Sequence, residues 1–152
     1  MSRHLLAGLL LFAGAVLADP PLRFLQARLY EAPPGVETLA AYFTIENPGS
    51  ADRVLRRFRS DDFARVELHE TRLEDGVAHM VPVPALTVPA GGRVALAPGG
   101  LHLMLIEPKR PLRAGDHFLL EIEEADGTLH QLLLPLRRRE DAGGHEHHSH
   151  HD

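Results

Sequence analysis

Residues 114–136 read AGDHFLLEIEEADGTLHQLLLPL, and this stretch decides the fold class. It holds two apolar-rich runs, His117–Glu123 and Thr128–Leu136, separated by an aspartate-glycine pair that is typical of a tight turn. Within the first run, alternate residues from Phe118 to Ile122 are apolar, although Leu119 blurs the pattern. Alternation with a period of two is typical of a strand with one buried face. The stretch therefore predicts a pair of neighbouring β-strands.

The same arrangement extends over residues 22–136, where short apolar-rich runs are separated by Gly, Pro, Asn and Asp. No run shows sustained helical periodicity, and the only helical element we expect is one turn at Asp61–Ala64. The predicted strands are Leu22–Glu31, Thr38–Glu46, Arg53–Arg59, Arg65–Glu70, Val77–Val83, Arg93–Ala97, Leu101–Ile106, His117–Glu123 and Thr128–Leu136. Turn signals about every ten residues are typical of a sandwich or small barrel. We predict a single all-β domain, an Ig-like Greek-key β-sandwich or small barrel.

Composition limits the function. The chain has 152 residues, of which 44% are hydrophobic and 24% charged, which suits one ordinary core. A formal net charge of −5 gives no electrostatic basis for binding nucleic acid, so we expect none. The absence of cysteine excludes thiolate zinc sites, iron–sulfur clusters, disulfides and thiolate-ligated blue copper. Any soft-metal chemistry must use the eleven histidines and three methionines.

The N-terminus resembles an export signal. Arg3 and His4 precede an apolar run, Leu5–Leu17, that is followed by the small residue Ala18. The run is shorter than the about 20 residues of a transmembrane helix and matches a secretory signal peptide. We therefore predict a signal peptide over residues 1–18 and no stable membrane insertion after its cleavage. An exported chain without cysteine suits the periplasm, or another extracytoplasmic space, where free thiols oxidise.

The C-terminus differs from the preceding domain, which we place at residues 19–136. Residues 137–152 contain no large apolar side chain, and we predict a mobile tail. Five histidines crowd its end: His145, His147, His148, His150 and His151. This density is typical of segments that chelate Cu(II), Ni(II) or Zn(II) once the imidazoles are neutral. A purification tag is the alternative, but Glu146 and Ser149 interrupt the run, which favours a native extension.

Four residues outside the tail are candidate ligands for a metal: His69, Met80, His102 and Met104. His102 and Met104 are two residues apart in a predicted strand, so their side chains project from the same face. The turn at Glu74–Gly76 lets the next strand run back toward His69, which would bring Met80 close. Two imidazoles and two thioethers form a neutral, soft ligand set that suits Cu(I) better than Zn(II), Mg(II) or Ca(II).

The spacing by itself leaves a second interpretation open. Met80 could fill a gap in the core, and His69 and His102 could be ordinary surface or hydrogen-bonded histidines, as single residues of these types more often are. His79 is a further imidazole beside Met80. Adjacent residues of a strand face opposite ways, so His79 is not among the four candidates and its role stays open.

The four residues stand as H-x10-M-x21-H-x-M, which resembles the copper-binding signature of the PCuAC family of periplasmic copper chaperones. Neighbouring segments are similar as well: Val66–Thr71, Glu74–Val77, Pro89–Gly92, Pro98–Leu105, Ala41–Phe43, Asn47 and Asp52–Leu55. The resemblance covers about residues 22–136, and no position of the signature departs from it. It implies a cupredoxin-like β-sandwich or barrel that binds one Cu(I) through His69, Met80, His102 and Met104.

The resemblance also implies a non-enzymatic function. A protein of this family would deliver copper to the CuA centre of cytochrome c oxidase, so the expected partners are the oxidase subunit that carries CuA, a second copper chaperone, or both. We expect the carrier to be a monomer. By the same resemblance, the histidine-rich tail would gather Cu(II) and pass copper toward the core site.

Other functions compete with this prediction. An electron-transfer cupredoxin is disfavoured because the chain lacks the thiolate of a blue copper site and because a His/Met ligand set strongly favours one oxidation state. A periplasmic metal-buffering or resistance protein remains an alternative, as does a metal-independent β-sandwich adaptor, which would tolerate leucine at Met80 and Met104. A hydrolase is disfavoured, since the sequence contains neither G-x-S-x-G nor H-E-x-x-H.

Overall fold

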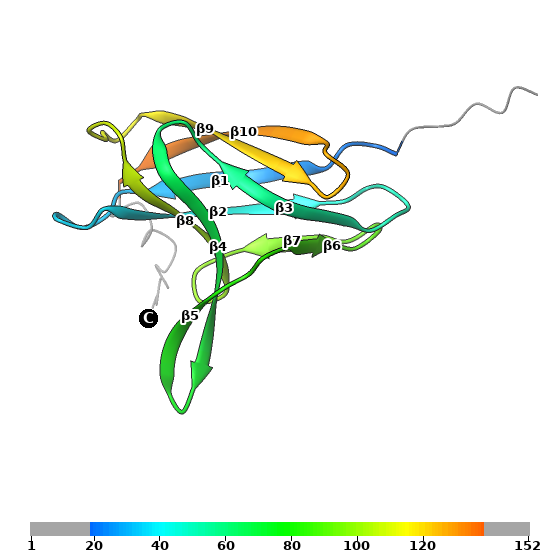
Figure 1. Ribbon diagram of the computed structural model, residues 1–152, viewed down its shortest axis with the longest axis horizontal. Coiled ribbons are helices and arrows are strands. Elements are labelled where there is room, and N and C mark those ends of the chain that lie inside the picture. Colours follow the sequence, from blue (N-terminus) through cyan, green and yellow to red (C-terminus); the bar gives the residue numbers. More distant parts are fainter. Residues whose placement is uncertain (1–18, 139–152) are drawn as a thin grey trace, which may run out of the picture.

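The computed structural model describes residues 19–138, and these residues form β-strands and loops without a helix (Figure 1). The strands are β1 (Arg23–Tyr30), β2 (Thr38–Glu46), β3 (Arg53–Arg59), β4 (Phe63–Glu74), β5 (Val77–Pro82), β6 (Leu86–Val88), β7 (Arg93–Leu96), β8 (Leu101–Pro108), β9 (His117–Glu124) and β10 (Leu129–Arg137). Because this part of the chain has no helix at all, it has none that could cross a membrane. The predicted signal peptide and the five tail histidines lie outside the described residues.

The strands form two layers that are joined by one parallel contact (Figure 1). The first layer runs in the order β5-β4-β8-β2-β1, and β7 pairs with a further part of β2. The second layer runs β10-β9-β3-β6, and β10 lies parallel to β1. The order ends at β5 and at β6, so the sheet is open and does not close into a barrel. The predicted all-β sandwich is confirmed.

The core lies between the layers and follows the period of two seen in the sequence. In β9, the alternate residues from Phe118 to Ile122 are fully buried, whereas Leu119 is 42% exposed. The buried residues of β2 alternate in the same way from Leu39 to Ile45. Across the core, the ring of Phe63 in β4 meets that of Phe118 in β9 edge to face, with 5.3 Å between centroids. This contact packs one layer on the other.

Two details of the sequence prediction were wrong. The helical turn expected at Asp61–Ala64 is a two-residue turn at residues 61–62, and Phe63 already begins β4 with its ring buried in the core. The short strand β6 was missed, because its three residues are followed by Pro89 and carry too little alternation to signal a strand.

The hairpin of β4 and β5 projects away from the sandwich body (Figure 1). Its two central turn residues, Asp75 and Gly76, both have positive φ, at 52° and 80°. This is the geometry of a type I′ turn, for which an Asp-Gly pair is favoured because glycine adopts positive φ without strain. The two-residue turn pairs Glu74 with Val77 and so fixes the register of the whole hairpin.

Candidate metal centre

Three of the four predicted ligands share the outer face of two packed strands. His69 of β4 is directly opposite His102 of β8 in the antiparallel pair. Met104 follows His102 on the same face, because the residue between them, Leu103, points into the core and is fully buried. The core side chains of β4 and β8 therefore hold these two histidines and this methionine in fixed directions.

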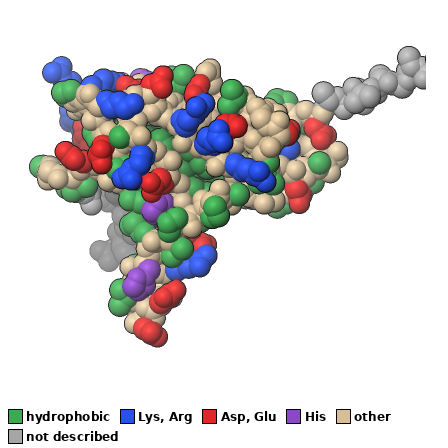
Figure 2. Space-filling model, viewed as in Figure 1, with side chains coloured by type: hydrophobic (Ala, Val, Ile, Leu, Met, Phe, Trp, Pro, Cys, Tyr) green, Lys and Arg blue, Asp and Glu red, His purple; other side chains and the backbone are tan. Residues whose placement is uncertain are grey.

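Met80 reaches the same face from the projecting hairpin. It pairs with Thr71, which is two residues beyond His69 in β4, while His69 itself pairs with Pro82. Met80 is 61% exposed, the value of a side chain that no core contact fixes. His79 pairs with Arg72 and so belongs to the opposite face of the hairpin, as the sequence indicated. In the space-filling view, hydrophobic, histidine and charged side chains all lie on this hairpin (Figure 2).

The imidazole of His102 is buried and held by one hydrogen bond. Its Nδ1 lies 3.0 Å from the carbonyl oxygen of Gly100. A carbonyl only accepts, so Nδ1 carries the proton and donates it; the same oxygen also accepts from the Thr71 backbone N–H at 3.1 Å. The other ring nitrogen, Nε2, is buried without a hydrogen-bond partner. In the neutral ring that nitrogen holds a free lone pair.

His69 shows the same arrangement with its two nitrogens exchanged. Its Nε2 lies 3.0 Å from Oε2 of Glu67, and a carboxylate oxygen accepts, so Nε2 donates. Its Nδ1 is buried and has no hydrogen-bond partner. The side chain is 12% exposed, so water does not readily satisfy the ring. Each histidine thus offers one unpaired nitrogen at a buried position.

The two rings are close enough to bind one metal ion. Their centroids lie 6.2 Å apart, and their planes are inclined by 44°. With metal–nitrogen bonds of about 2.0 Å, two imidazoles on one ion have centroids about 5 to 6.4 Å apart, depending on the bond angle. A buried polar atom without a partner costs about 1–3 kcal/mol, which a bound ion would relieve. The pair therefore fits a metal site.

A cavity of about 360 Å³ opens beside the histidine pair, and it is lined by His102, Met80 and Met104 together. The loop before β8 forms part of its wall through Pro98 and Gly99. The sequence predicted that this loop would place His102 near a strand end, which is confirmed, since β8 begins one residue before it. His69 is not among the lining residues; it lies opposite His102 on the neighbouring strand.

The walls of this cavity are uncharged. The remaining lining residues are Val36, Thr38, Leu39, Ala40, Tyr42 and Thr71. Burial raises the pKa of Tyr42 above its ordinary value, against the opposing effect of Arg28, whose guanidinium lies 5.9 Å from the ring centroid. The phenol therefore stays neutral near neutral pH. A cavity wall of low polarity suits a soft, weakly hydrated metal ion better than a strongly hydrated divalent ion.

Acidic or imidazole groups alone do not form a metal site in the described residues. Between residues 19 and 138, no three His, Cys, Asp or Glu side chains are placed to bind one ion. The two imidazoles would need further donors to hold an ion, and the thioethers of Met80 and Met104 lie on the cavity wall beside His102. Such a mixed set is typical of Cu(I).

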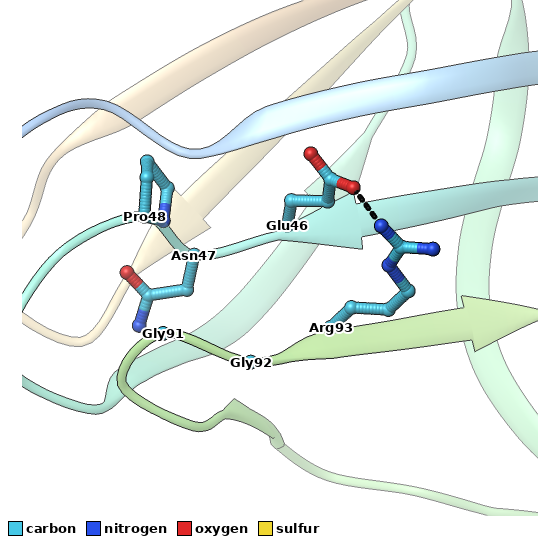
Figure 3. Close-up of a pocket in the computed structure, with 6 residues that line it drawn as sticks. All are labelled: Glu46, Asn47, Pro48, Gly91, Gly92 and Arg93. Atoms are coloured by element: carbon cyan, nitrogen blue, oxygen red, sulfur yellow. Dashed lines mark hydrogen bonds and ion pairs between the residues drawn. The ribbon is translucent and has the colours of Figure 1, made fainter.

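A second hollow, of about 280 Å³, shows what a cavity with satisfied polar groups looks like (Figure 3). Arg93 forms an ion pair with Glu46 on its wall. The Asn47 amide donates to the carbonyls of Ala51 and Val88, at 2.8 and 3.0 Å, and its oxygen accepts from a backbone N–H. These bonds hold the surrounding loops together. No buried side-chain nitrogen or oxygen of this wall is without a partner, in contrast to the histidine pair.

Two groups that contact the histidines were missed in the sequence. Glu67 shares a strand face with His69 because the two are two residues apart, and this spacing could have identified it. The Gly100 carbonyl gave no such signal, since any residue there supplies the same oxygen. Both groups fix ring orientation, the common function of hydrogen bonds behind a metal ligand.

Comparison with known proteins gives a family and a fold. A family model described as "Putative lipoprotein LpqE-like" matches residues 22–135. A "putative lipoprotein" of Leifsonia xyli subsp. xyli is 31% identical over 99 residues, which are 64% of this chain and 60% of the relative. The chain therefore matches less than two thirds of that relative's length.

Two solved structures share the fold. The solution structure of the Cu(I) form of DR1885 from Deinococcus radiodurans is 29% identical, with a TM-score of 0.65 and coverage of 84% of each chain. The copper-bound PCuAC domain of PmoF2 also has a TM-score of 0.65, over 80% of this chain and 97% of that domain. At 18% identity, the second likeness shows the fold alone. The fold is that of the cupredoxin-like sandwiches.

Proposed function

Because the chain belongs to the LpqE-like family, whose fold is shared by a Cu(I)-bound protein, we propose that it is a non-enzymatic copper(I) chaperone. The ligands would be His69, Met80, His102 and Met104. One observation carries the proposal: the facing imidazoles of His69 and His102 each keep one buried nitrogen without a partner, next to two thioethers.

The position of the ligands suits binding and release. His69, His102 and Met104 lie on strands that pack on the core, whereas Met80 is 61% exposed on the hairpin. Three fixed donors would retain copper, and the exposed thioether would be the first that an incoming partner could replace. A chaperone needs both properties, because it must protect copper from solution and still transfer it.

The copper acceptor is proposed from the sequence. The spacing H-x10-M-x21-H-x-M supports delivery to the CuA centre of cytochrome c oxidase, directly or through a second copper chaperone. We propose that the carrier acts as a monomer and binds no nucleic acid, as its net charge of −5 indicates.

The tail would act as an accessory copper-binding segment. β10 ends at Arg137, which pairs with Tyr30 of β1, and the Tyr30 ring lies 6.2 Å from the Tyr42 ring on the cavity wall. An extended chain spans about 3.3–3.6 Å per residue, so residues 139–152 are long enough to reach the cavity. The five tail histidines would capture Cu(II). Each Cu(II) ion would have to gain one electron from an external donor before the core site could bind it as Cu(I).

The proposed location is the periplasm, reached through the signal peptide at residues 1–18. The family description as lipoproteins agrees with a location outside the cytoplasm.

An anaerobic Cu(I) titration against a colorimetric chelator tests the proposal. The chain with serine in place of all five tail histidines should still retain one equivalent of Cu(I), and the further pair His69→Ala and His102→Ala should abolish it. If copper is lost with the tail alone, the protein is a metal buffer. If no variant, nor the unmodified chain, retains Cu(I), the metal-independent adaptor is the better function.

A further inference from the structure

Within residues 19–138, Glu67 is the one charged side chain that is hydrogen-bonded to a predicted ligand. Its Oε2 lies 3.0 Å from Nε2 of His69, on the same face of β4, and it pairs across the strands with Met104. The carboxylate is 40% exposed, and its other oxygen lies 3.9 Å from the Arg65 guanidinium. Neither its charge nor its position is explained by core packing.

We propose that Glu67 is a positioning residue that selects Nδ1 of His69 as the atom that binds Cu(I). This inference rests on the proposed function. By accepting the Nε2 proton in a hydrogen bond, the carboxylate holds the neutral ring in one tautomer and leaves the lone pair on Nδ1. The Gly100 carbonyl does the reverse for His102, whose Nε2 is left free.

The two histidines consequently bind copper through different ring nitrogens. His69 and His102 lie directly opposite each other in the strand pair. Binding His69 through Nδ1, the atom nearer its backbone, and His102 through Nε2, the farther atom, places the copper off the midline of the strand pair. That shift is toward β4, the strand whose other neighbour, β5, carries Met80. Glu67 fixes this asymmetry.

Glu67 also supplies a charge that the ligands lack. Two neutral imidazoles and two thioethers leave the charge of Cu(I) uncompensated, and the cavity wall beside them is uncharged. A carboxylate that accepts a hydrogen bond from the ring nitrogen that does not bind the metal makes the imidazole a stronger donor, and its negative charge offsets that of the ion. Loss of such a partner typically costs about 10- to 100-fold in metal affinity.

The test replaces Glu67 in the full-length chain and reads the His69 tautomer directly. Long-range proton–nitrogen NMR of the copper-free protein, with the His69 signals assigned from His69→Gln, should show the proton on Nε2. Glu67→Leu should lose that preference and bind Cu(I) about tenfold or more weakly. Glu67→Gln, whose amide oxygen can still accept the hydrogen bond, should restore the tautomer and part of the affinity.

The matched control is Glu70→Leu. Glu70 is in the same strand and similarly exposed, but its carboxylate forms an ion pair with Arg72 at 2.8 Å and has no hydrogen bond to a histidine of residues 19–138. It should leave both the tautomer and the affinity unchanged. A wild-type His69 protonated on Nδ1, or Glu67→Leu binding as tightly as Glu70→Leu, would overturn the inference. Failure of the proposed function looks different, because His102→Ala would then also retain wild-type Cu(I) affinity.

Discussion

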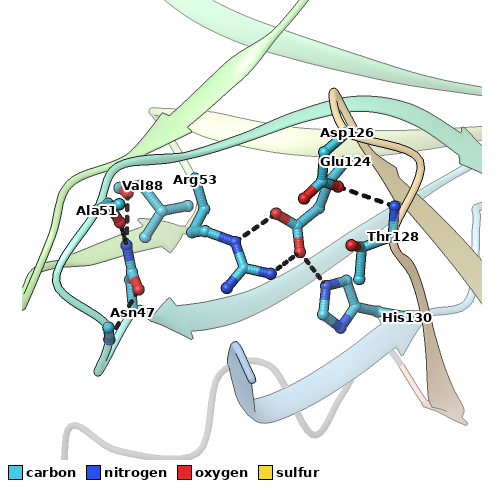
Figure 4. A network of polar contacts seen from close by, with 9 residues as sticks. Asn47, Ala51, Arg53, Val88, Glu124, Asp126, Thr128 and His130 are labelled. Carbon is cyan, nitrogen blue, oxygen red and sulfur yellow. Dashed lines mark hydrogen bonds and ion pairs between the residues drawn. The ribbon is translucent and has the colours of Figure 1, made fainter. Parts of the chain in front are cut away.

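Histidines are shielded from solvent in two regions of this protein, and their hydrogen bonding differs. In the second layer, His130 of β10 contacts the buried carboxylate of Glu124, which also accepts two hydrogen bonds from Arg53 (Figure 4). The His130 ring packs edge to face on Phe24, with centroids 5.4 Å apart. No buried nitrogen of His130 lacks a partner. At the metal centre, both histidines keep one such nitrogen.

The difference separates a structural histidine from one that is ready for a ligand. The Glu124 network is complete, so its groups stabilise the folded chain. Burial pushes the pKa of Glu124 upward, but hydrogen bonds from Arg53 and His130 outweigh burial, and the pKa lies below its usual range. Apart from the histidine pair, Ser60 Oγ is the one buried side-chain atom without a partner in residues 19–138. The buried nitrogens without a partner therefore lie at the candidate metal centre, where a bound ion would pair with them.

The largest expected effect is on stability, at the complete network. Glu124→Leu leaves the Arg53 guanidinium without its carboxylate at a site where the Arg53 side chain is only 15% exposed. Breaking a buried ion pair by removing one partner costs about 3–5 kcal/mol, so the free energy of unfolding in denaturant should fall by that order. Cu(I) affinity of the remaining folded protein should not change.

The control for this prediction is Glu123→Leu in the same strand. Glu123 pairs with Arg57, whose side chain is 64% exposed, and exposed pairs contribute about 0–1 kcal/mol. Equal destabilisation by the two changes would show that the Glu124 network is no more important than a surface pair.

At the metal centre, we expect a large loss of Cu(I) affinity with little change in stability. His102→Leu should lower Cu(I) affinity by at least about 100-fold, more than the loss of an outer hydrogen-bond partner typically costs. Stability of the copper-free chain should stay within about 1 kcal/mol, because the lost bond to Gly100 is offset by removal of the unsatisfied Nε2. Chelator competition and denaturant unfolding measure the two quantities. Severe destabilisation with intact copper binding would make His102 a structural residue like His130.

The two methionines should differ by a smaller margin. Met104→Leu should weaken Cu(I) binding by about tenfold or more, because the strand fixes its thioether beside His102. Met80→Leu should weaken it less and mainly speed transfer to a chelator, since Met80 is 61% exposed. Both changes conserve volume, so each should alter stability by less than about 1.5 kcal/mol. Chelator competition gives the Cu(I) affinity of each variant, and stopped-flow mixing with a Cu(I) chelator gives the rate of transfer. A larger loss of affinity in Met80→Leu than in Met104→Leu would contradict the prediction.

The smallest effect concerns pH. A carboxyl whose pKa is lowered by folding stabilises the folded state above its unfolded pKa and loses that contribution as pH falls through the folded value. Wild type should therefore lose stability below the usual glutamate pKa of about 4.3, and Glu124→Leu should lose less over the same range. Thermal unfolding of both chains from pH 6 to pH 3 tests this. If stability falls equally with pH in the two chains, Glu124 is not a source of the acid sensitivity.

Much of the fold could be predicted from the sequence because alternation and turn residues act locally. Thr38–Glu46 and Arg53–Arg59 match β2 and β3 residue for residue, and the Asp75-Gly76 turn forms as its dipeptide indicates. The pairing of strands that are distant in the sequence could not be predicted. No local pattern shows that β1 runs parallel to β10, since that contact is decided by packing of the whole core.

The site was predicted only in part for the same reason. The spacing of His102 and Met104 indicated a shared face, and the pairing of β4 with β8 places His69 opposite His102. Whether a histidine is satisfied depends on its surroundings in the fold. Glu124, the partner of His130, lies six residues before it across the β9–β10 turn, and no local sequence pattern marks this contact. The hydrogen bonds in the folded chain therefore distinguish a structural histidine from a candidate metal ligand, which composition alone cannot do.

X-ray absorption at the copper K edge identifies the atoms that bind copper in the core site. The sample is the Cu(I)-loaded chain with its five tail histidines replaced by serine, so that copper at the core alone is observed. Copper bound by two imidazoles and two thioethers should show nitrogen and sulfur neighbours in equal number, two of each, with both sulfurs lost in the Met80→Leu, Met104→Leu double variant. Copper bound only by nitrogen or oxygen in the parent chain, or sulfur neighbours that persist in the double variant, would contradict this ligand set.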